Sequence, residues 1–272
     1  MQCVPRGKRS NYACGDRVFL AQTSRHEGVI EAADPRSTLF VRAAPHRQKL
    51  IAANATQVAV IVAGEPSVSD ELVCRILIAA ERQGMRGIVV LNKVDLTGAT
   101  AAAREQLLPF RLAGYEIIEI SAKREIAPLR DRLAGEVTVL IGQSGMGKST
   151  IVNALVPDAD AATQEISRFL DSGRHTTAHA RFYRLDPASA IVDSPGVQEF
   201  GLAHLSRVEI EQGFREIAAL IGECRFRDCR HRTEPGCAVR AAVDSGEVHP
   251  RRLELLHAIL TAESGALMAA GR

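Results

Sequence analysis

The stretch Gly142-Gln143-Ser144-Gly145-Met146-Gly147-Lys148-Ser149-Thr150 decides the fold, because it matches the phosphate-loop pattern G-x-x-x-x-G-K-[ST] at every position. The residues before it, 137–141, predict a short buried strand, and residues 151–155 predict the start of a helix. A strand, a loop and a helix in this order are the context that the pattern requires. We therefore expect an α/β domain that holds a nucleoside triphosphate.

The residue types of the loop explain this expectation. Gly142, Gly145 and Gly147 allow the backbone to bend so that its N–H groups face one point. The helix that begins near Lys148 adds its positive end there, and the Lys148 ammonium can reach the outer phosphates. The Ser149 hydroxyl can hold Mg²⁺. The loop alone identifies neither the base nor the reaction.

A second motif indicates guanine. Residues 57–63 and 87–91 are continuous apolar runs separated by a predicted helix over 69–82, which is typical of two parallel buried strands. The second strand ends in Asn92-Lys93-Val94-Asp95. The Asp95 carboxylate can accept from the ring N1–H and the amine of guanine, which adenine cannot match. Asn92 can order the loop, and the stem of Lys93 can lie on the ring.

Three further motifs follow. A predicted strand over 115–120 ends in Ser121-Ala122-Lys123, where a backbone N–H can bind the guanine carbonyl oxygen. The polar segment 157–179 contains Gly173-Arg174-His175-Thr176-Thr177, in which Thr177 can close on Mg²⁺ and the γ-phosphate. A strand over 190–192 leads into Asp193-Ser194-Pro195-Gly196. In this D-x-x-G motif Asp193 can hold Mg²⁺ through water, and the Gly196 N–H can contact the γ-phosphate.

Composition favours a globular protein of two or three domains. The chain has 272 residues, of which 46% are hydrophobic and 24% charged. Its apolar runs are all much shorter than the ~20 residues of a membrane span, and its start lacks the apolar core of a signal peptide. We expect a cytoplasmic protein without a membrane partner. Its six cysteines are then thiols or metal ligands rather than disulfides.

The first fifty residues predict a small basic barrel. They hold nine Lys and Arg against four Asp and Glu, a net charge of +5 that leaves −3 for the rest. Short strands are predicted over 15–20, 28–32 and 39–42. A small basic barrel is a common nucleic-acid-binding module, although a solvated basic surface explains the charge equally well.

Near the end of the chain, Cys224-x4-Cys229-x-His231-x5-Cys237 predicts a metal site. Three thiolates and an imidazole within this short stretch suit a closed tetrahedral Zn²⁺ site, and four unrelated residues are the alternative. We interpret Cys3, Cys14 and Cys74 as structural or incidental. Several basic residues surround the cluster and predict a contact with RNA, which the resemblance described below narrows to ribosomal RNA, or a solvated face: Arg225, Arg227, Arg230, Arg232 and Arg240.

The five nucleotide motifs resemble those of translation-factor-like GTPases, but their order is permuted, since the phosphate loop here follows N-K-x-D and S-A-K. With the basic barrel and the zinc motif, the chain resembles the circularly permuted, small-ribosomal-subunit-dependent GTPases of bacteria, known as the RsgA, YjeQ or EngC family. Four further stretches look like signatures of that family: residues 15–18, 49–54, 173–177 and 234–237.

The resemblance implies an OB-like basic barrel over 1–50, a circularly permuted GTPase domain over 51–200 and a helical zinc-binding domain over 201–272. It implies slow GTP hydrolysis to GDP and phosphate that the 30S subunit stimulates, a role in late maturation of that subunit, and contacts with its 16S rRNA. We expect a monomer. Two features differ from the family. The chain starts just before the stretch 15–18, so we expect a shortened barrel. Gln143 replaces the more usual proline, and we expect little effect.

For the reaction, water attacks the γ-phosphate while Mg²⁺, Lys148 and backbone N–H groups stabilise the developing charge. Many GTPases place a glutamine after D-x-x-G to orient this water. The chain has Val197 there, which predicts slow intrinsic hydrolysis. His175 is a catalytic candidate that the resemblance suggests, and the alternative is a loop histidine that binds RNA or packs.

Two other function classes compete with a ribosome-assembly GTPase. The first is a P-loop kinase or ATPase, against which Asn92–Asp95 argues directly. The second is a zinc-containing rRNA-binding protein in which GTP binding is only regulatory. The intact Lys148, Ser149 and Asp193 argue against that reading, and a turnover assay separates the two.

Overall fold

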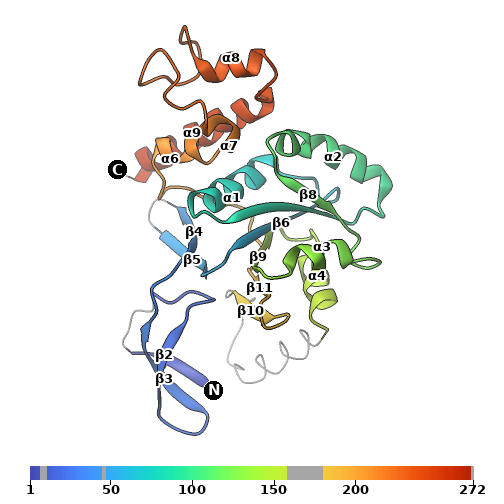
Figure 1. Ribbon diagram of the computed structural model, residues 1–272, viewed down its shortest axis with the longest axis vertical. Helices are drawn as coiled ribbons and strands as arrows, with labels where there is room; N and C mark the ends of the chain where they lie inside the picture. Colours follow the sequence, from blue (N-terminus) through green and yellow to red (C-terminus); the bar gives the residue numbers. More distant parts are fainter. Residues whose placement is uncertain (7–10, 45–46, 158–179, 271–272) are drawn as a thin grey trace.

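The centre of the molecule is a six-stranded sheet in the order β10-β11-β9-β6-β7-β8 (Figure 1). The computed structural model describes residues 1–6, 11–44, 47–157 and 180–270. Neighbouring strands are parallel except β10, which runs antiparallel to β11. The strands are β6 (Gln57–Ala63), β7 (Arg86–Asn92), β8 (Glu116–Glu119), β9 (Val137–Gly142), β10 (Arg181–Arg184) and β11 (Ala190–Asp193).

Helices cover both faces of this sheet, which explains the continuous apolar runs of its central strands. In β6, Val60 faces the core on the side of α1 (Asp70–Arg82) and α2 (Thr97–Leu112). Ile61 faces a second core with α3 (Ala127–Leu133) and α4 (Lys148–Leu155). Figure 1 shows the two helix layers on opposite sides of the sheet. Each fully buried valine or isoleucine contributes about 1.5–3 kcal/mol, so both layers matter for stability.

Helix α1 begins where its cap predicts. Ser69 lies outside the helix, and its hydroxyl accepts a hydrogen bond of 3.3 Å from the Leu72 N–H, which confirms Ser69 as the N-cap. Asp70 and Glu71 in the first turn add negative charge at the positive end of the helix. The connection from β6 through α1 to β7 is thus the parallel crossover that the sequence predicts.

The order of the strands positions a ligand site. From β6 the chain moves outward through β7 to β8, and it then returns to place β9 on the other side of β6. The direction of winding therefore reverses between β6 and β9. In open parallel sheets, ligands bind beyond the carboxyl ends of the strands at such a reversal.

The N-terminal residues form two small sheets rather than one continuous barrel wall among the described residues. The first has the order β1-β3-β2, with β1 (Gln2–Pro5) parallel to β3 (Glu27–Ala33), and β2 (Val18–Gln22) antiparallel to it. The second is the antiparallel pair β4 (Leu39–Ala44) and β5 (Arg47–Ala53). The short strands predicted near 15–20, 28–32 and 39–42 are present, whereas the sequence patterns did not indicate β1 or β5.

The C-terminal region is helical, with α6 (Arg207–Gln212), α7 (Arg215–Ala218), α8 (Ala238–Asp244) and α9 (Pro250–Ala270). The apolar residues from 210 to 221 do lie largely in helices, but two short helices, α6 and α7, are present, and they are separated at Gly213. A Cβ at Gly213 would lie 2.5 Å from Ile78 Cγ2, so close packing against α1 requires glycine here. Within the described residues, the helices are all too short or too polar to cross a membrane.

Candidate functional site

The predicted nucleotide motifs lie together at the carboxyl edge of the sheet, around two adjoining cavities. A cavity of about 420 Å³ lies over the phosphate loop, and one of about 220 Å³ lies beside the N-K-x-D and S-A-K motifs. Lys93, Lys123, Gly147 and Thr150 line both cavities. The larger is otherwise lined by Gln143, Ser144, Gly145, Lys148, Ser149 and Gly196, and the smaller by Asn92, Asp95, Leu96, Ser121 and Ala122.

The phosphate loop approaches the N-K-x-D motif closely at one glycine. Gly147, the N-cap of α4, has a φ of 89°, which is the left-handed region that favours glycine. A Cβ there would lie 2.3 Å from Asn92 Nδ2. Both the conformation and the contact therefore exclude a larger residue. Met146 beside it is buried in the core, and it serves the site through its backbone carbonyl.

Asn92 connects the motifs through both atoms of its amide group. Its Nδ2 donates to the Met146 carbonyl at 3.0 Å, and its Oδ1 accepts from the Ala122 N–H at 3.0 Å. The side chain is only 2% exposed. These two hydrogen bonds order the loops, which is the role that the sequence analysis suggested for Asn92.

Lys93 and Asp95 lie at the mouths of the cavities. Lys93 has a φ of 61°, and its Nζ donates to the Glu65 carbonyl at 2.8 Å. A hydrogen bond from the Ser121 hydroxyl lowers the pKa of the Asp95 carboxyl, with smaller contributions from nearby positive charges. Asp95 is therefore ionised at neutral pH, as acceptance from guanine requires. Val94 lies partly buried behind it, and its N–H donates to the Ile120 carbonyl at 3.2 Å.

On the phosphate side, the D-x-x-G motif lies against the phosphate loop. Lys148 Nζ and the Asp193 carboxylate form a short ion pair whose side chains are 11% and 23% exposed. A Cβ at Gly196 would lie 3.5 Å from the Ser144 N–H nitrogen, so the two loops are in contact. Val197 donates its N–H to the Gly142 carbonyl at 3.0 Å, and its side chain is buried in the core. Val197 therefore offers no polar group to the cavity. The predictions for His175 and Thr177 concern residues outside the described ranges.

The cysteine and histidine cluster has the geometry of a metal centre. The ligand atoms of Cys224, Cys229, His231 and Cys237 all lie within 4.8 Å of one another. In a tetrahedral Zn²⁺ site the sulfurs lie about 3.8 Å apart and sulfur lies about 3.5 Å from nitrogen, given Zn–S of about 2.3 Å and Zn–N of about 2.0 Å. Here Cys224 Sγ lies 3.9 Å from Cys237 Sγ and 3.6 Å from His231 Nδ1. The donor set therefore fits a tetrahedral metal ion.

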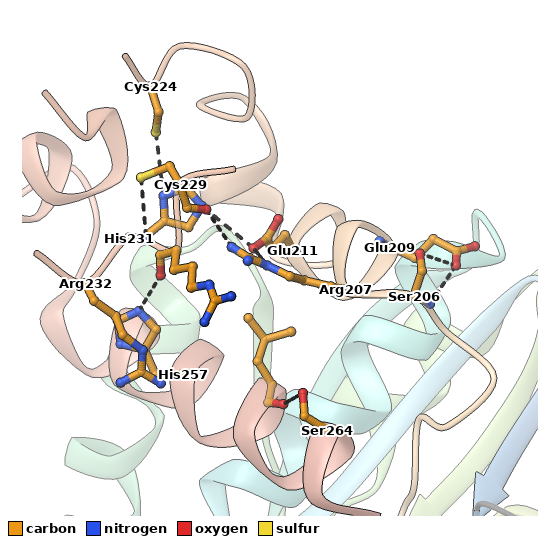
Figure 2. Close-up of polar contacts among 12 residues, drawn as sticks. Ser206, Arg207, Glu209, Glu211, Cys224, Cys229, His231, Arg232, His257 and Ser264 are labelled. Atoms are coloured by element: carbon orange, nitrogen blue, oxygen red, sulfur yellow. Dashed lines mark hydrogen bonds and ion pairs between the residues drawn. The ribbon is translucent and has the colours of Figure 1, made fainter. Parts of the chain in front are cut away.

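The sequence patterns did not indicate two side chains that lie against this cluster, those of Arg207 and Glu211. Glu211 on α6 is buried, and its Oε1 lies 3.8 Å from His231 Nε2. Arg207 donates to Glu211 Oε1 at 2.7 Å and to the Cys229 carbonyl at 2.6 Å. Figure 2 shows these contacts converging on one side of the cluster. The only local signal was the Arg207 and Glu211 spacing of four residues, which is common on helices.

The sequence patterns also did not indicate two residues that lie at the nucleotide site, Leu96 and Pro66. Leu96 lines the smaller cavity directly after Asp95, so its place follows from the same strand end. Pro66 follows β6 and lies against the phosphate loop, within 3.3 Å of the position that a Cβ on Gly145 would take. The sequence around Pro66 shows no recognised motif, and only the strand order brings it here.

Comparison with known proteins agrees with this architecture. The sequence model of the RsgA GTPase family matches residues 33–203. A relative from Nitrosospira multiformis, named "Small ribosomal subunit biogenesis GTPase RsgA", is 52% identical over 260 residues, which cover 96% of this chain and 83% of the relative.

Two solved structures are also similar. YjeQ from Thermotoga maritima superimposes with a TM-score of 0.74 at 28% identity, over 97% of this chain and 90% of that one. YloQ, described as a circularly permuted GTPase, gives a TM-score of 0.70 at 24% identity, over 97% of this chain and 86% of that one, and supports the fold alone. These findings confirm the predicted permuted fold and the predicted resemblance. The chain belongs to the RsgA GTPase family.

Proposed function

We propose that this chain hydrolyses GTP to GDP and phosphate in the late maturation of the 30S ribosomal subunit. The observation that carries the proposal is the pair of adjoining cavities, one over the phosphate loop and one beside Asp95 and Ser121. Their shared wall at Gly147 and Thr150 allows one ligand to extend from a base in the smaller cavity to phosphates in the larger one.

In this proposal the motif residues bind GTP as their positions suggest. The ionised Asp95 accepts from the guanine N1–H and amine, and a backbone N–H of the Ser121–Lys123 stretch other than that of Ala122 contacts the base carbonyl. Lys93 lies along the ring. The phosphate loop from Gly142 to Thr150 surrounds the phosphates with N–H groups. Mg²⁺, which the reaction of a GTPase uses, would be held by Ser149, by Asp193 through water, and by Thr177.

Catalysis would depend on charge stabilisation more than on a base within the described residues. Lys148 and the Gly196 N–H would stabilise the charge that develops on the γ-phosphate, for which Lys148 has to turn from Asp193 to the phosphate. Val197 is buried and apolar, so another group must orient the attacking water. His175 and Thr177 are our candidates for completing the site, and slow hydrolysis without the subunit is the expected consequence.

We propose Zn²⁺ as the ion of the Cys224, Cys229, His231 and Cys237 cluster, because three thiolates and one imidazole are a usual structural zinc set. The five arginines around it are exposed: Arg225, Arg227, Arg230, Arg232 and Arg240. This face, together with the basic N-terminal strands, would contact 16S rRNA. We propose that the protein acts as a cytoplasmic monomer, with a barrel-like part over 1–50, the GTPase part over 51–200 and the zinc part over 201–272.

Phosphate release from GTP and from ATP, with and without purified 30S subunits, tests the proposal. We expect slow release from GTP, strong stimulation by 30S subunits and no release from ATP. Lys148→Ala should abolish the stimulated rate. Fast hydrolysis without subunits would show that a complete catalytic group is already present.

Absence of GTP turnover under every condition, with GTP binding retained, would favour the alternative of a zinc-containing rRNA-binding protein with a regulatory nucleotide. A separate binding assay on 30S subunits at rising salt tests the basic surfaces. Affinity should fall steeply with salt if phosphate contacts dominate, and an unchanged affinity would exclude them.

A further inference from the structure

We propose that Glu211 of α6, which lies behind the imidazole of His231, selects the nitrogen through which His231 binds the metal. The inference rests on the proposal above that the cluster holds a metal ion. It is carried by the placement of the imidazole between two sets of partners. His231 Nδ1 lies 3.6 Å from Cys224 Sγ and 3.4 Å from Cys237 Sγ, whereas Nε2 lies 3.8 Å from Glu211 Oε1.

The two ring nitrogens of His231 therefore face opposite chemistry. Nδ1 faces the thiols, as a ligand atom must, and Nε2 faces a carboxylate, which attracts an N–H. A neutral imidazole carries a proton on one nitrogen only. With Glu211 beside Nε2, the proton is favoured there and Nδ1 keeps its lone pair for the metal. Metal-binding histidines commonly have such a carboxylate behind them, which fixes the tautomer and the ring orientation.

The approach of Glu211 to His231 is important because both side chains are buried. The side chains of His231 and Glu211 are only 5% and 7% exposed. A buried carboxylate is unfavourable unless it has partners, and Glu211 has two groups near it: the imidazole and the guanidinium of Arg207 at 2.7 Å. If Glu211 served only to pair with Arg207, it could lie on the exposed surface of α6. Its side chain instead lies on the side of α6 that faces the cluster (Figure 2).

The positive charge of Arg207 compensates negative charge at the metal centre. Three thiolates outweigh the two positive charges of a divalent ion, so the loaded centre is negative, and Glu211 adds to that charge. The guanidinium of Arg207 lies beside Glu211 and donates to the Cys229 carbonyl at 2.6 Å. Backbone N–H groups add to this compensation, because the His231 N–H lies 3.4 Å from Cys229 Sγ and the Arg240 N–H lies 3.4 Å from Cys237 Sγ.

The test is cobalt binding to the full chain after its metal has been removed with a chelator. Co²⁺ reports its own ligand geometry through visible absorption, and competition with a chelator gives its affinity. Glu211→Gln keeps the shape of the side chain and an acceptor oxygen but removes the charge, and Glu211→Met removes both. Glu209→Gln is the matched control, because it makes the same change on an exposed part of α6 and retains a capping side chain at that position.

We expect Glu211→Gln to weaken cobalt affinity about 10-fold and Glu211→Met up to about 100-fold, with Glu209→Gln unchanged. Nitrogen NMR of imidazole-labelled protein should place the His231 proton on Nε2 in the loaded wild type, and its resonance should shift in Glu211→Gln. Circular dichroism and binding of a fluorescent GTP analogue verify that each variant is folded.

Two results would overturn the inference, and they can be told apart. Equal cobalt affinity, spectrum and Nε2–H resonance in the wild type and the folded Glu211 variants would show that Glu211 only pairs with Arg207, while the metal site itself stands. Failure of the wild type to bind cobalt or zinc would remove the metal site and this inference together. Neither result bears on GTP hydrolysis, which the phosphate-release assay tests separately.

Discussion

Asn92 joins three loops with one amide group. It is the last residue of β7, donates to the phosphate loop at Met146 and accepts from the S-A-K loop at Ala122. Because the side chain is 2% exposed, water cannot replace either partner easily. The relative placement of the two cavities therefore depends on the two hydrogen bonds of this amide group.

Removing this amide should weaken nucleotide binding without destroying the fold. In Asn92→Ala the Met146 carbonyl and the Ala122 N–H lose their partner, which costs about 1–3 kcal/mol of stability. We expect at least about 5-fold weaker binding of a fluorescent GTP analogue, because part of that cost reappears as loop disorder. Gln106→Ala, on the exposed face of α2, is the control and should bind normally. Unchanged affinity in Asn92→Ala would show that the loops hold their places independently.

Asp95 gives a prediction about the identity of the base. Asn at this position cannot accept from both the N1–H and the amine of guanine, whereas its own amide can donate to the carbonyl that xanthine carries instead. Asp95→Asn should therefore weaken GTP binding by about 100-fold or more and gain affinity for xanthosine triphosphate. Competition between the two nucleotides measures both changes. Equal loss for both nucleotides would mean that Asp95 acts on the loop rather than on the base.

Among the elements, the turn before β2 has a structural role that the sequence analysis did not predict, because it considered the basic residues of this region only as a surface. The Asp16 carboxylate accepts from Arg36 Nε and Nη2, both at 2.7 Å, and from the Ala13 N–H at 2.7 Å. Next to it, the Cys14 carbonyl accepts from the Ala53 N–H at 2.8 Å. This turn thereby connects the three-stranded sheet to β5. Arg36, which the sequence grouped with basic residues for nucleic acid, is committed to this turn.

Asp16→Asn should loosen these strands in a pH-dependent way. Burial raises the pKa of Asp16, but the hydrogen bonds from Arg36 and Ala13 outweigh it, so the pKa is lowered in the folded protein. A lowered pKa stabilises the fold above the unfolded value and loses that effect as the pH falls through the folded value. We expect a loss of about 1.5–3 kcal/mol in local stability near neutral pH, measured by hydrogen exchange in β2 and β3.

The difference between Asp16→Asn and the wild type should shrink as the pH falls below about 4, the ordinary pKa of an aspartate. Glu31→Gln is the matched control, because its ion pair with Arg6 is 3.4 Å long and well exposed, and such pairs contribute little. A loss of stability that stays constant down to acid pH would assign the effect to packing rather than to charge.

At the scale of the whole molecule, the helical region is fastened to the sheet domain by buried arginines. Arg252 on α9 is 1% exposed, and its Nε pairs closely with the Glu216 carboxylate. Its guanidinium lies 4.5 Å from the ring of Phe214 and 5.0 Å from that of Phe110 on α2. Cation–π contacts of this kind stabilise by about 0.5–2 kcal/mol each, so Arg252 joins α7, α9 and α2 at one point.

Arg252→Met should undock this region. It leaves the Glu216 carboxylate buried without its partner, which costs about 3–5 kcal/mol. We expect a lower midpoint of chemical unfolding and earlier proteolysis between residues 201 and 250, with part of the loss recovered in the double variant Arg252→Met/Glu216→Gln. Arg251→Met is the control, since its pairs with Asp70 and Glu254 are exposed. Additive losses in the double variant would show that Arg252 and Glu216 do not interact.

The sequence predicted those features that depend on neighbouring residues. The apolar run 57–63 coincides with β6, and Ser69 caps α1, because both follow from local pattern and cap chemistry. Motifs at strand ends also meet in space, since parallel strands share a carboxyl edge. Buried pairs such as Arg75 with Glu263 depend on groups far apart in the chain, and a local pattern gives no sign of them. The need for glycine at residue 213 was hidden for the same reason, because it follows from contact with Ile78 on α1.

A single segment of backbone joins the phosphate side of the nucleotide site to the helical region. The D-x-x-G segment runs from β11 directly towards the helical region, and on its way the Ala43 N–H donates to the Gly201 carbonyl while the Leu202 N–H donates to Glu263. β4 and α9 therefore hold this segment in place, each through one hydrogen bond. Any movement of the helical region relative to the sheet would have to displace this segment together with the Arg75–Glu263 and Arg215–Glu81 ion pairs, which cross the same boundary.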